Sequence, residues 1–257
     1  MSMSTDSGAA NTRFRGWHET VKTAIQVLVL VAIVRTFFYQ PFIIPSGSMI
    51  QTLLVGDYLF VSKLAYGYSR YSLTIPFTSI PVIPFNGRVF GALPKRGDVV
   101  VFKLPRDTEK DYIKRIIGLP GDEIFVRDGV VHINGTPVPK VRAGDYVEED
   151  GHPTPRYRET LPNGVSYLVL DSEPNGDYDN TPTFVVPPGH YFMMGDNRDN
   201  STDSREQSPY RGVGFVPYEN LVGRAEIIFF SSAIDNVRSP WTWPFDIRWR
   251  RIFGLVR

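Results

Sequence analysis

The sequence predicts a mainly β protein, in which an antiparallel β core carries a smaller β-rich insertion and follows one N-terminal transmembrane helix. The β fold is predicted by composition and by turn signals: the 257 residues include 22 glycines and 21 prolines, with many aromatic and β-branched residues. These residue types favour short strands joined by tight turns. The helix is predicted by residues 24–34 (AIQVLVLVAIV), which are almost entirely apolar.

The composition excludes several classes of chemistry. The formal net charge is +1, which gives no reason to expect a nucleic-acid partner. The chain contains no cysteine, and this excludes a thiol nucleophile, a thiolate-bound metal and disulfides. The four histidines are scattered without the spacing of metal ligands, so we expect no metal site.

Residues 17–39 are predicted to cross the membrane. A bilayer requires roughly 20 residues, and a helix over this whole range is long enough, with Lys22 and Arg35 reaching outward from it. Residues 1–16 are expected to form a cytoplasmic tail without regular structure. Basic residues before the span favour a cytoplasmic N-terminus, whereas Arg35 beyond it opposes this orientation.

An uncleaved anchor has two alternatives, a buried core helix and a cleavable secretory signal. The rest of the sequence predicts no helices against which a core helix could pack. A cleavage site would require small residues soon after the apolar run, but residues 35–42 read RTFFYQPF. The uncleaved anchor is therefore favoured, and it places Ser48 just beyond the membrane.

Residues 45–53 (PSGSMIQTL) place small hydroxyl residues on a glycine turn between apolar segments. Pro45 restricts the backbone before the turn, and Gly47 allows another chain to approach closely. Ser48 is a candidate nucleophile whose backbone N–H could serve as an oxyanion donor. Most Ser-Gly-Ser sequences are only turns, and this motif alone favours a plain turn.

Two predicted strands follow, separated by a proline-rich ribbon. Residues 55–61 (VGDYLFV) carry β-formers after a Gly-Asp turn, and residues 99–102 (VVVF) are typical of a strand buried on both faces. Between them, the prolines of residues 66–91 exclude a central strand. This ribbon either packs under a sheet or enters the membrane surface.

Residues 111–122 (DYIKRIIGLPGD) alternate like a strand and stop at a Pro-Gly turn. Lys114 shares one face of that strand with Tyr112 and Ile116. Burial of this face would lower the pKa of Lys114 and make it a base near neutral pH. The alternative is a lysine that extends to solvent from an edge strand, and the strand pattern alone favours this alternative.

We expect residues 123–189 to form the β-rich insertion, between a first part of the core at residues 40–122 and a second part at residues 190–236. Glycine-containing hairpin signals recur along the insertion, which indicates short antiparallel strands. These signals are Asp128-Gly129, Asn134-Gly135 and Asn163-Gly164.

Two polar loops lie within and after the insertion. Residues 171–180 (DSEPNGDYDN) begin like a calcium-binding loop, but Pro182 stands where the bidentate glutamate belongs, so we expect a solvated loop. Residues 193–205 (MMGDNRDNSTDSR) can bond to their own backbone and pair arginines with carboxylates. This second loop is either a stiff support for a base or an ordinary surface loop.

Four sequence motifs behind an apolar anchor resemble those of bacterial type I signal peptidases. They are PSGSM (45–49), RGDVVVF (96–102), YIKRIIGLPGD (112–122) and GDNRDNSTDSR (195–205), and the likeness extends over residues 35–231. Four motifs in the same order as in the family are far more specific evidence for the resemblance than any single motif. The resemblance implies a serine endopeptidase with a Ser-Lys dyad on an antiparallel β catalytic core next to the membrane.

The resemblance also implies roles for individual residues. Ser48 matches the nucleophile, and Lys114 matches the general base that takes its proton. The Ser48 backbone N–H and the Ser46 hydroxyl match the oxyanion hole, and Ser201 matches the residue that hydrogen-bonds the lysine.

Further residues would hold the polar loop or line the substrate pockets. Asp203 and Arg205 would hold the polar loop in place. The apolar residues next to the matched catalytic positions are expected to line small-residue pockets, and they are Phe42, Ile44, Pro45, Met49, Tyr112 and Ile113.

The same resemblance implies the substrate and the setting. Exported preproteins would be cut after a small-x-small motif at the end of their signal peptide, without a metal or organic cofactor. We expect a single-pass protein of the bacterial cytoplasmic membrane, with its catalytic domain on the extracytoplasmic side. The expected partners are signal peptides and the lipid bilayer, with the protein export machinery as a further candidate and no nucleic acid.

This sequence departs from well-known members in its single predicted span, its lack of a cysteine pair in the insertion and its C-terminal tail, residues 237–257. The tail suits a membrane interface, and packing against the core is the alternative. It combines Trp241, Trp243 and Trp249 with Arg248, Arg250 and Arg251.

Two other functions stay open. A self-cleaving Ser-Lys protease of the type found in soluble repressors would require an N-terminal DNA-binding helical domain, where this chain has an apolar segment. A catalytically inactive, membrane-tethered β module that binds peptides or envelope partners is not excluded by the sequence. The presence of both Ser48 and Lys114 in matched contexts argues against lost activity.

Overall fold

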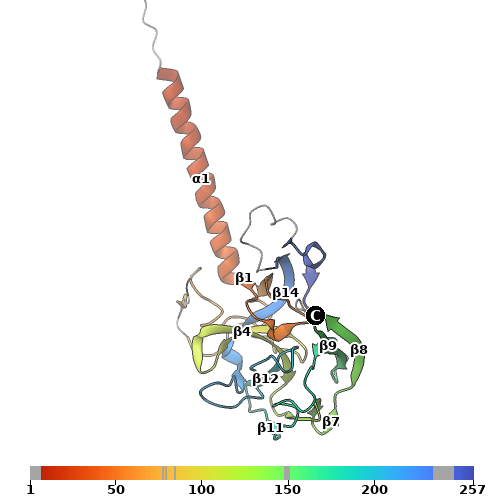
Figure 1. Cartoon of the computed structure of the whole chain (residues 1–257). Coiled ribbons are helices and arrows are strands. Elements are labelled where there is room, and N and C mark those ends of the chain that lie inside the picture. Colours follow the sequence, from red (N-terminus) through yellow and green to blue (C-terminus); the bar gives the residue numbers. More distant parts are fainter. Residues whose placement is uncertain (1–6, 77, 79, 84, 148–150, 234–245) are drawn as a thin grey trace, which may run out of the picture.

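Figure 1 shows a computed structural model of the chain, in which one long helix extends from a β-rich body. The structure describes residues 7–76, 78, 80–83, 85–147, 151–233 and 246–257. The helical elements are α1 (Ser7–Phe37) and the 3-10 turns η1 (Gly47–Met49), η2 (Tyr218–Asn220) and η4 (Trp249–Arg251). The strands are β1 (Tyr39–Ile43), β2 (Asp57–Ser62), β3 (Val99–Leu104), β4 (Asp107–Gly118), β5 (Glu123–Arg127), β6 (Val130–Ile133), β7 (Thr136–Pro137), β8 (Lys140–Val147), β9 (Pro153–Thr160), β10 (Ser166–Leu170), β11 (Phe184–Val185), β12 (His190–Met194), β13 (Val216–Pro217), β14 (Leu221–Ser231) and β15 (Gly254–Leu255).

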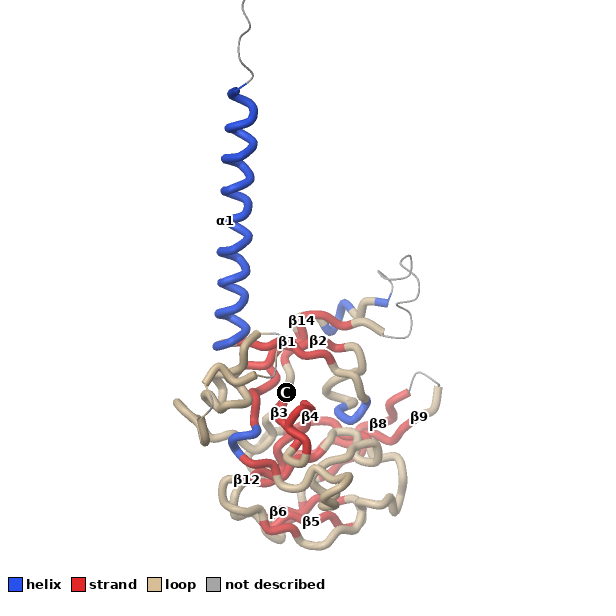
Figure 2. The backbone as a smooth tube through the Cα atoms, turned by 90° about the vertical axis from the view of Figure 1, so that its left-hand side faces the viewer, coloured by secondary structure: helices blue, strands red, loops and turns tan. Residues whose placement is uncertain are grey.

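Helix α1 stands alone, away from the β body, in both Figure 1 and Figure 2. Its segment Trp17–Phe37 has 21 residues, is long and apolar enough to cross a membrane, and is only 6% buried by the rest of the protein. The helix begins at Ser7, so the expectation that residues 7–16 lack regular structure is wrong. Adding residues to an existing helix requires far less free energy than forming its first turn. The helix that forms in the apolar segment can therefore extend towards the N-terminus.

The end of α1 is fastened to the β body by polar contacts. Lys63, at the end of β2, donates from Nζ to the Thr36 carbonyl at 3.3 Å, and its backbone N–H donates to the Phe38 carbonyl at 2.9 Å. Tyr68 donates to the Phe37 carbonyl at 2.8 Å. Burial, and to a smaller extent the charge of Arg35, lowers the pKa of Lys63 to about 8.

The main sheet has the strand order β1-β2-β14-β3-β4-β12-β13, with β15 also paired to β14, and its pairs are antiparallel. All six residues of β3 are buried, as expected for the apolar residues 99–102, and the burial extends to Lys103 and Leu104. Strand β4 lies between β3 and β12. Lys114 is only 4% exposed, so the alternative that it extends to solvent from an edge strand is wrong.

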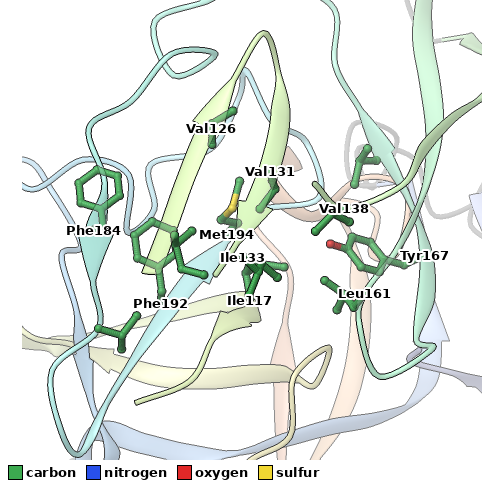
Figure 3. Packing of buried hydrophobic residues seen from close by; sticks show 13 residues of the cluster. Ile117, Val126, Val131, Ile133, Val138, Leu161, Tyr167, Phe184, Phe192 and Met194 are labelled. Carbon is green, nitrogen blue, oxygen red and sulfur yellow. The ribbon is translucent and has the colours of Figure 1, made fainter. Parts of the chain in front are cut away.

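Residues 123–189 form two smaller antiparallel sheets, with the orders β10-β9-β8 and β11-β5-β6-β7. Asp128 and Asn134 have φ values of 48° and 52°, which the predicted two-residue turns require. Side chains of these sheets pack on Ile117 of β4 and Phe192 of β12 in one buried cluster (Figure 3). The small sheets are thereby attached to the strand that carries Lys114.

The proline-rich ribbon is anchored at its base and exposed at its tip. Tyr66 is buried, and Arg88 donates to the Gly67 carbonyl at 2.7 Å and to the Tyr218 carbonyl at 3.0 Å. Near the tip, Ile80 and Ile83 are 59% and 58% exposed. The base therefore packs against the sheet, and entry of the tip into a membrane stays a prediction.

The described part of the C-terminal tail packs against the core. Strand β15 pairs with β14, with Leu255 opposite Ile227 and Gly254 opposite Ile228. Trp249 is 66% exposed, whereas Trp241 and Trp243 lie outside the described residues.

Candidate active site

Ser48 lies on the 3-10 turn η1, which is fixed by the apolar residues around it. Met49 and Leu53 are fully buried in the core cluster that also contains Ile44. The Leu53 N–H donates to the Met49 carbonyl at 2.8 Å. Since the turn is anchored through these buried neighbours, Ser48 itself is held in place while remaining 8% exposed.

Lys114 faces this turn from the middle of the main sheet. Its backbone is opposite Val100 of β3, its side chain is buried, and its Nζ is 2.5 Å from the Ser48 Oγ. Burial lowers the pKa of Lys114 to about 8. The carboxylates of Asp203 and Asp196 act in the opposite direction, and Arg205 adds to the lowering.

Asp203 organises the polar loop after β12. Its carboxylate accepts from the Gly195 N–H at 3.0 Å, from the Ser201 hydroxyl at 2.9 Å and from two guanidinium nitrogens of Arg205 at 2.9 Å each. Burial alone would raise the pKa of Asp203, but Arg205 and the backbone donors hold that pKa below its ordinary value. The carboxylate is therefore a stable anion that keeps the loop in one conformation.

The same loop touches the nucleophile turn directly. Asn197 donates from its backbone to the Ser48 carbonyl at 3.1 Å and from Nδ2 to the Gly47 carbonyl at 3.2 Å. A Cβ at Gly195 would lie 2.6 Å from the Ser48 carbonyl oxygen and 2.2 Å from the Ser201 Oγ. Only glycine permits the loop and the turn to pack this closely.

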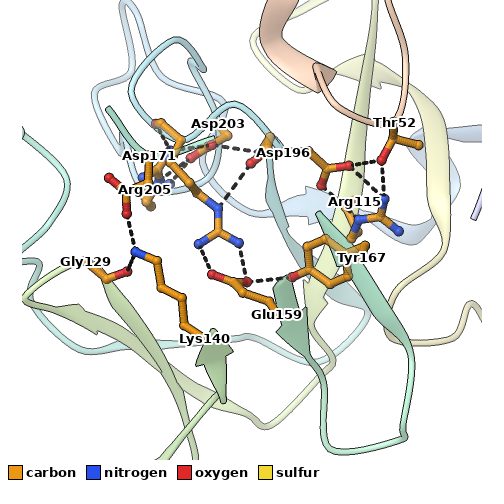
Figure 4. Close-up of polar contacts among 12 residues, drawn as sticks. Thr52, Arg115, Gly129, Lys140, Glu159, Tyr167, Asp171, Asp196, Asp203 and Arg205 are labelled. Atoms are coloured by element: carbon orange, nitrogen blue, oxygen red, sulfur yellow. Dashed lines mark hydrogen bonds and ion pairs between the residues drawn. The ribbon is translucent and has the colours of Figure 1, made fainter. Parts of the chain in front are cut away.

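A buried ion pair ties β4 to both segments (Figure 4). Arg115 donates to Asp196 from Nε at 2.8 Å and from Nη2 at 2.7 Å, and to the Thr52 hydroxyl at 2.9 Å. The Thr52 hydroxyl also donates to Asp196 at 2.5 Å. The Arg115 guanidinium lies 4.1 Å from the centre of the Tyr167 ring. The Arg115 guanidinium therefore contacts Asp196, Thr52 and strand β10 of the insertion.

A second buried pair joins the loop to the insertion. Arg198 donates to Glu159 of β9 from both terminal nitrogens, and Glu159 also accepts from the Tyr167 hydroxyl at 2.9 Å. The Arg198 N–H donates to the Leu170 carbonyl at 2.9 Å. The insertion thus supports the loop that contacts the Ser48 turn.

A cavity of about 500 Å³ opens beside Ser48 and Lys114. Of the residues predicted to bind substrate, Pro45, Tyr112 and Ile113 line it. The other three lie in the core cluster behind it: Ile44 and Met49 are buried there and Phe42 packs against them. A part in substrate binding for these three stays a prediction. The complete lining is Pro45, Ser46, Ser48, Asp111, Tyr112, Ile113, Lys114, Tyr178, Asp199, Asn200, Ser201 and Thr202.

Ser201 lies beside Lys114, as expected, but it lacks the expected hydrogen bond to that lysine. Ser201 lines the same cavity as Lys114, but its hydroxyl donates to Asp203 at 2.9 Å. No hydrogen bond joins Ser201 to Lys114 in the described part of the chain. Asp203 carries a full charge and is a stronger acceptor than the lysine amine would be.

Three residues of the site were not predicted individually from the sequence. Asn197 and Asn200 belong to the polar loop at residues 193–205, and Tyr178 is the third. Tyr178 comes from the insertion, where it donates to Glu206 at 3.1 Å. No local pattern marks Tyr178, because its place at the cavity depends on how the insertion docks.

The acidic loop is mostly exposed, as expected for a solvated loop, although one of its carboxylates is buried. Asp179 is 7% exposed, and one oxygen each of Asp171, Asp179 and Asp199 lies within 4.8 Å of the others. The Lys140 ammonium forms an ion pair with Asp171 (Figure 4). Asp199 accepts from the Ser172 N–H at 2.6 Å. The loop is therefore held against the polar loop by its own ion pairs and hydrogen bonds.

A buried serine hydroxyl beside a buried amine of lowered pKa can carry out nucleophilic acyl transfer, with the amine as base. An antiparallel β fold with this pair in an open cavity belongs to the class of serine endopeptidases.

Comparison with known proteins identifies the family. The family model described as signal peptidase, peptidase S26, matches residues 17–230. The signal peptidase I of Rickettsia typhi (strain ATCC VR-144 / Wilmington) is 45% identical over 214 residues, covering 81% of this chain and 78% of that protein. The signal peptidase I of Rickettsia rickettsii (strain Sheila Smith) is 41% identical over 267 residues, covering 98% and 97%. The crystal structure of a signal peptidase I from Enterococcus faecalis V583 is 29% identical, with a TM-score of 0.32, and covers 52% of this chain and 97% of that one. This chain belongs to the signal peptidase family, whose members remove signal peptides.

Proposed function

We propose that this chain is a membrane-anchored peptidase that removes signal peptides from exported preproteins, with Ser48 as nucleophile and Lys114 as general base. One observation carries the proposal: the Lys114 Nζ lies 2.5 Å from the Ser48 Oγ, with both side chains buried beside an open cavity. At this distance the two groups are within hydrogen-bond reach of each other, as proton transfer requires.

The reaction proceeds through an ester on Ser48. Neutral Lys114 accepts the hydroxyl proton as Oγ attacks the scissile carbonyl carbon, and then donates that proton to the leaving amine. Lys114 next takes a proton from a water molecule, whose oxygen attacks the ester carbonyl. The released Ser48 oxygen recovers a proton, and the enzyme returns to its starting state.

The charge that develops on the carbonyl oxygen requires donors close to Ser48. The Ser48 backbone N–H and the Ser46 hydroxyl serve as these donors, and the fact that both residues line the cavity supports this role. Loss of one such donor typically costs about 3 to 4 kcal/mol of transition-state stabilisation.

The substrate binds in the cavity of about 500 Å³ and is cut after a small-x-small motif. Pro45, Tyr112 and Ile113 bring apolar surface close to the dyad, so small side chains fit there better than large ones. Ile44 and Met49 support these walls from the core.

Helix α1 anchors the enzyme in the bacterial cytoplasmic membrane as a single span, with the N-terminus in the cytoplasm. The β body lies on the extracytoplasmic side, where exported preproteins emerge. The segment Trp17–Phe37, which has 21 residues and is apolar enough to cross a membrane, supports the span. Signal peptides and the lipid bilayer are the partners that this arrangement requires, and the export machinery is a further one.

The test is cleavage of a purified preprotein by the full chain in detergent. Ser48→Ala and Lys114→Met should each abolish cleavage, whereas the control Ser166→Ala, on the exposed end of β10, should not. Cleavage of many preprotein molecules per enzyme would exclude a protease that cuts only itself. Lack of cleavage by the unaltered chain would favour the inactive binding module, and full activity of either dyad variant would exclude the dyad.

A further inference from the structure

The terminal segment, residues 246–257, returns to the nucleophile turn after the end of the main sheet. Strand β15 lies along the part of β14 that β3 does not pair with, since β3 pairs with Leu221–Arg224 and β15 with Ile227 and Ile228. The Val256 side chain packs against the core cluster that contains Met49 and Leu53. Figure 2 marks the end of the chain beside β3 and β4, where Arg115 donates to the Arg257 main-chain oxygen at 3.2 Å.

Arg251 makes the most specific contacts of this segment. Its Nε donates to Asp57 Oδ1 at 3.0 Å, and its Nη2 donates to Asp57 Oδ2 and, at 3.0 Å, to the Thr52 carbonyl. Asp57 is fully buried and also accepts from the Leu54 N–H at 2.8 Å. One guanidinium therefore holds both ends of the stretch from Thr52 to Asp57. Arg248 adds a contact within that stretch, donating to the Val55 carbonyl at 2.8 Å.

This stretch is the continuation of the turn that presents Ser48. Residues 52–56 belong to no helix or strand, and Asp57 is the first residue of β2, so the order of this backbone depends on side chains and distant segments. Thr52 is bound on one side by Arg115 and Asp196 and on the other by Arg251. Contacts with Arg115 and the polar loop therefore hold the nucleophile turn on one side, and contacts with the terminal segment hold it on the other.

Catalytic groups must be held within about 0.5 Å of their productive geometry, and a misplacement of 1 Å can cost about 100-fold in rate. Removing Arg251 would leave the buried Asp57 charge without its cation and free the Thr52 carbonyl. The turn would then gain alternative conformations, in fewer of which the Ser48 Oγ lies within reach of Lys114.

We propose that Arg251 is a positioning residue for the nucleophile, and that the terminal segment acts as a clamp on the Thr52–Asp57 stretch. The clamp acts through the Ser48 turn and makes no contact with substrate, so it affects turnover more than substrate binding. This inference rests on the proposed role of Ser48.

Steady-state cleavage of a preprotein by the full chain in detergent tests the clamp. Arg251→Met should lower kcat about tenfold while KM stays within twofold. The matched control is Arg250→Met, because Arg250 lies on the same turn, is exposed and forms no hydrogen bond or ion pair with another described residue. It should keep both constants within twofold. Arg251→Lys, which keeps a cation at Asp57, should lower kcat only two- to threefold.

Amide hydrogen exchange separates positioning from a general loss of stability. In Arg251→Met, the amides of residues 50–57 should exchange at least tenfold faster, while those of β5 and β6 keep their rates. A kcat equal to that of Arg250→Met, or slower turnover with unchanged exchange at residues 50–57, would overturn the inference.

If Arg251→Met does not fold, the same measurements on Arg251→Lys test the clamp. A kcat two to three times lower with faster exchange at residues 50–57 supports the clamp, and unaltered values of both overturn it. Ser48→Ala keeps the two proposals distinguishable. If that variant still cleaves, the proposed function fails. If only Arg251→Met is without effect, the clamp alone fails.

Discussion

The lowered pKa of Lys114 predicts the pH dependence of cleavage. An ordinary lysine has a pKa of 10.5, and burial lowers that of Lys114 to about 8. At pH 7 about one molecule in 10 then carries the neutral amine, compared with about one in 3,000 at the ordinary pKa. Burial therefore increases the population of usable base about 300-fold. We expect kcat/KM to rise about tenfold per pH unit below pH 7 and to level off above pH 8.

Replacing the amine tests the same reasoning. Lys114→Met keeps a long unbranched side chain without the base and should lower kcat/KM by at least about 100-fold at every pH from 6 to 10. Preprotein cleavage in detergent, sampled over that range, measures both the profile and the loss. Lys110→Met is the matched control on the same strand, because the Lys110 side chain is 62% exposed and pairs with Asp107. The Lys110→Met enzyme should keep the pH–rate profile of the unaltered chain.

The same pKa shift has a consequence for stability. Between about pH 8 and 10.5 the unfolded chain holds a proton on Lys114 that the folded chain has released, so the free energy of unfolding rises with pH in this window. Below it, the buried ammonium destabilises the fold by at most about 3 kcal/mol. Lys114→Met should therefore raise the unfolding temperature at pH 7. A rate profile with its midpoint near 10.5, or a Lys114→Met enzyme of unaltered rate, would refute the assignment.

Three further substitutions test the geometry of the site, each measured as kcat and KM for preprotein cleavage. Gly195→Ala should reduce kcat at least 100-fold, because its Cβ would lie 2.6 Å from the Ser48 carbonyl oxygen; retained activity would show that the loop can move away. Ser46→Ala should lower kcat roughly 100- to 1,000-fold with little change in KM if its hydroxyl is an oxyanion donor, and an unchanged kcat would remove it from that role. Ser201→Ala loses the hydrogen bond to Asp203 and should lower kcat about tenfold, whereas an enzyme as fast as the unaltered chain would reduce Ser201 to a lining residue.

Local features of the fold were predictable because their causes are local. The apolar run around residues 24–34 predicted the long helix, and the apolar residues 99–102 predicted the buried strand β3. The hairpin turns at Asp128 and Asn134 followed from residues that tolerate positive φ. The start of α1 was misplaced by ten residues, since the cooperative extension of a helix is not visible in a local pattern.

Four ordered motifs were enough to predict the family and the identities of the two residues proposed for the chemistry. The burial of Lys114 could not be predicted, because it depends on the Ser48 turn and the polar loop, which reach Lys114 from distant parts of the chain. Strand order, the docking of the insertion on the polar loop and the contact of Arg251 with Asp57 join residues far apart in the chain. Such contacts are set by packing of the whole core and leave no periodic signal in the segments that make them.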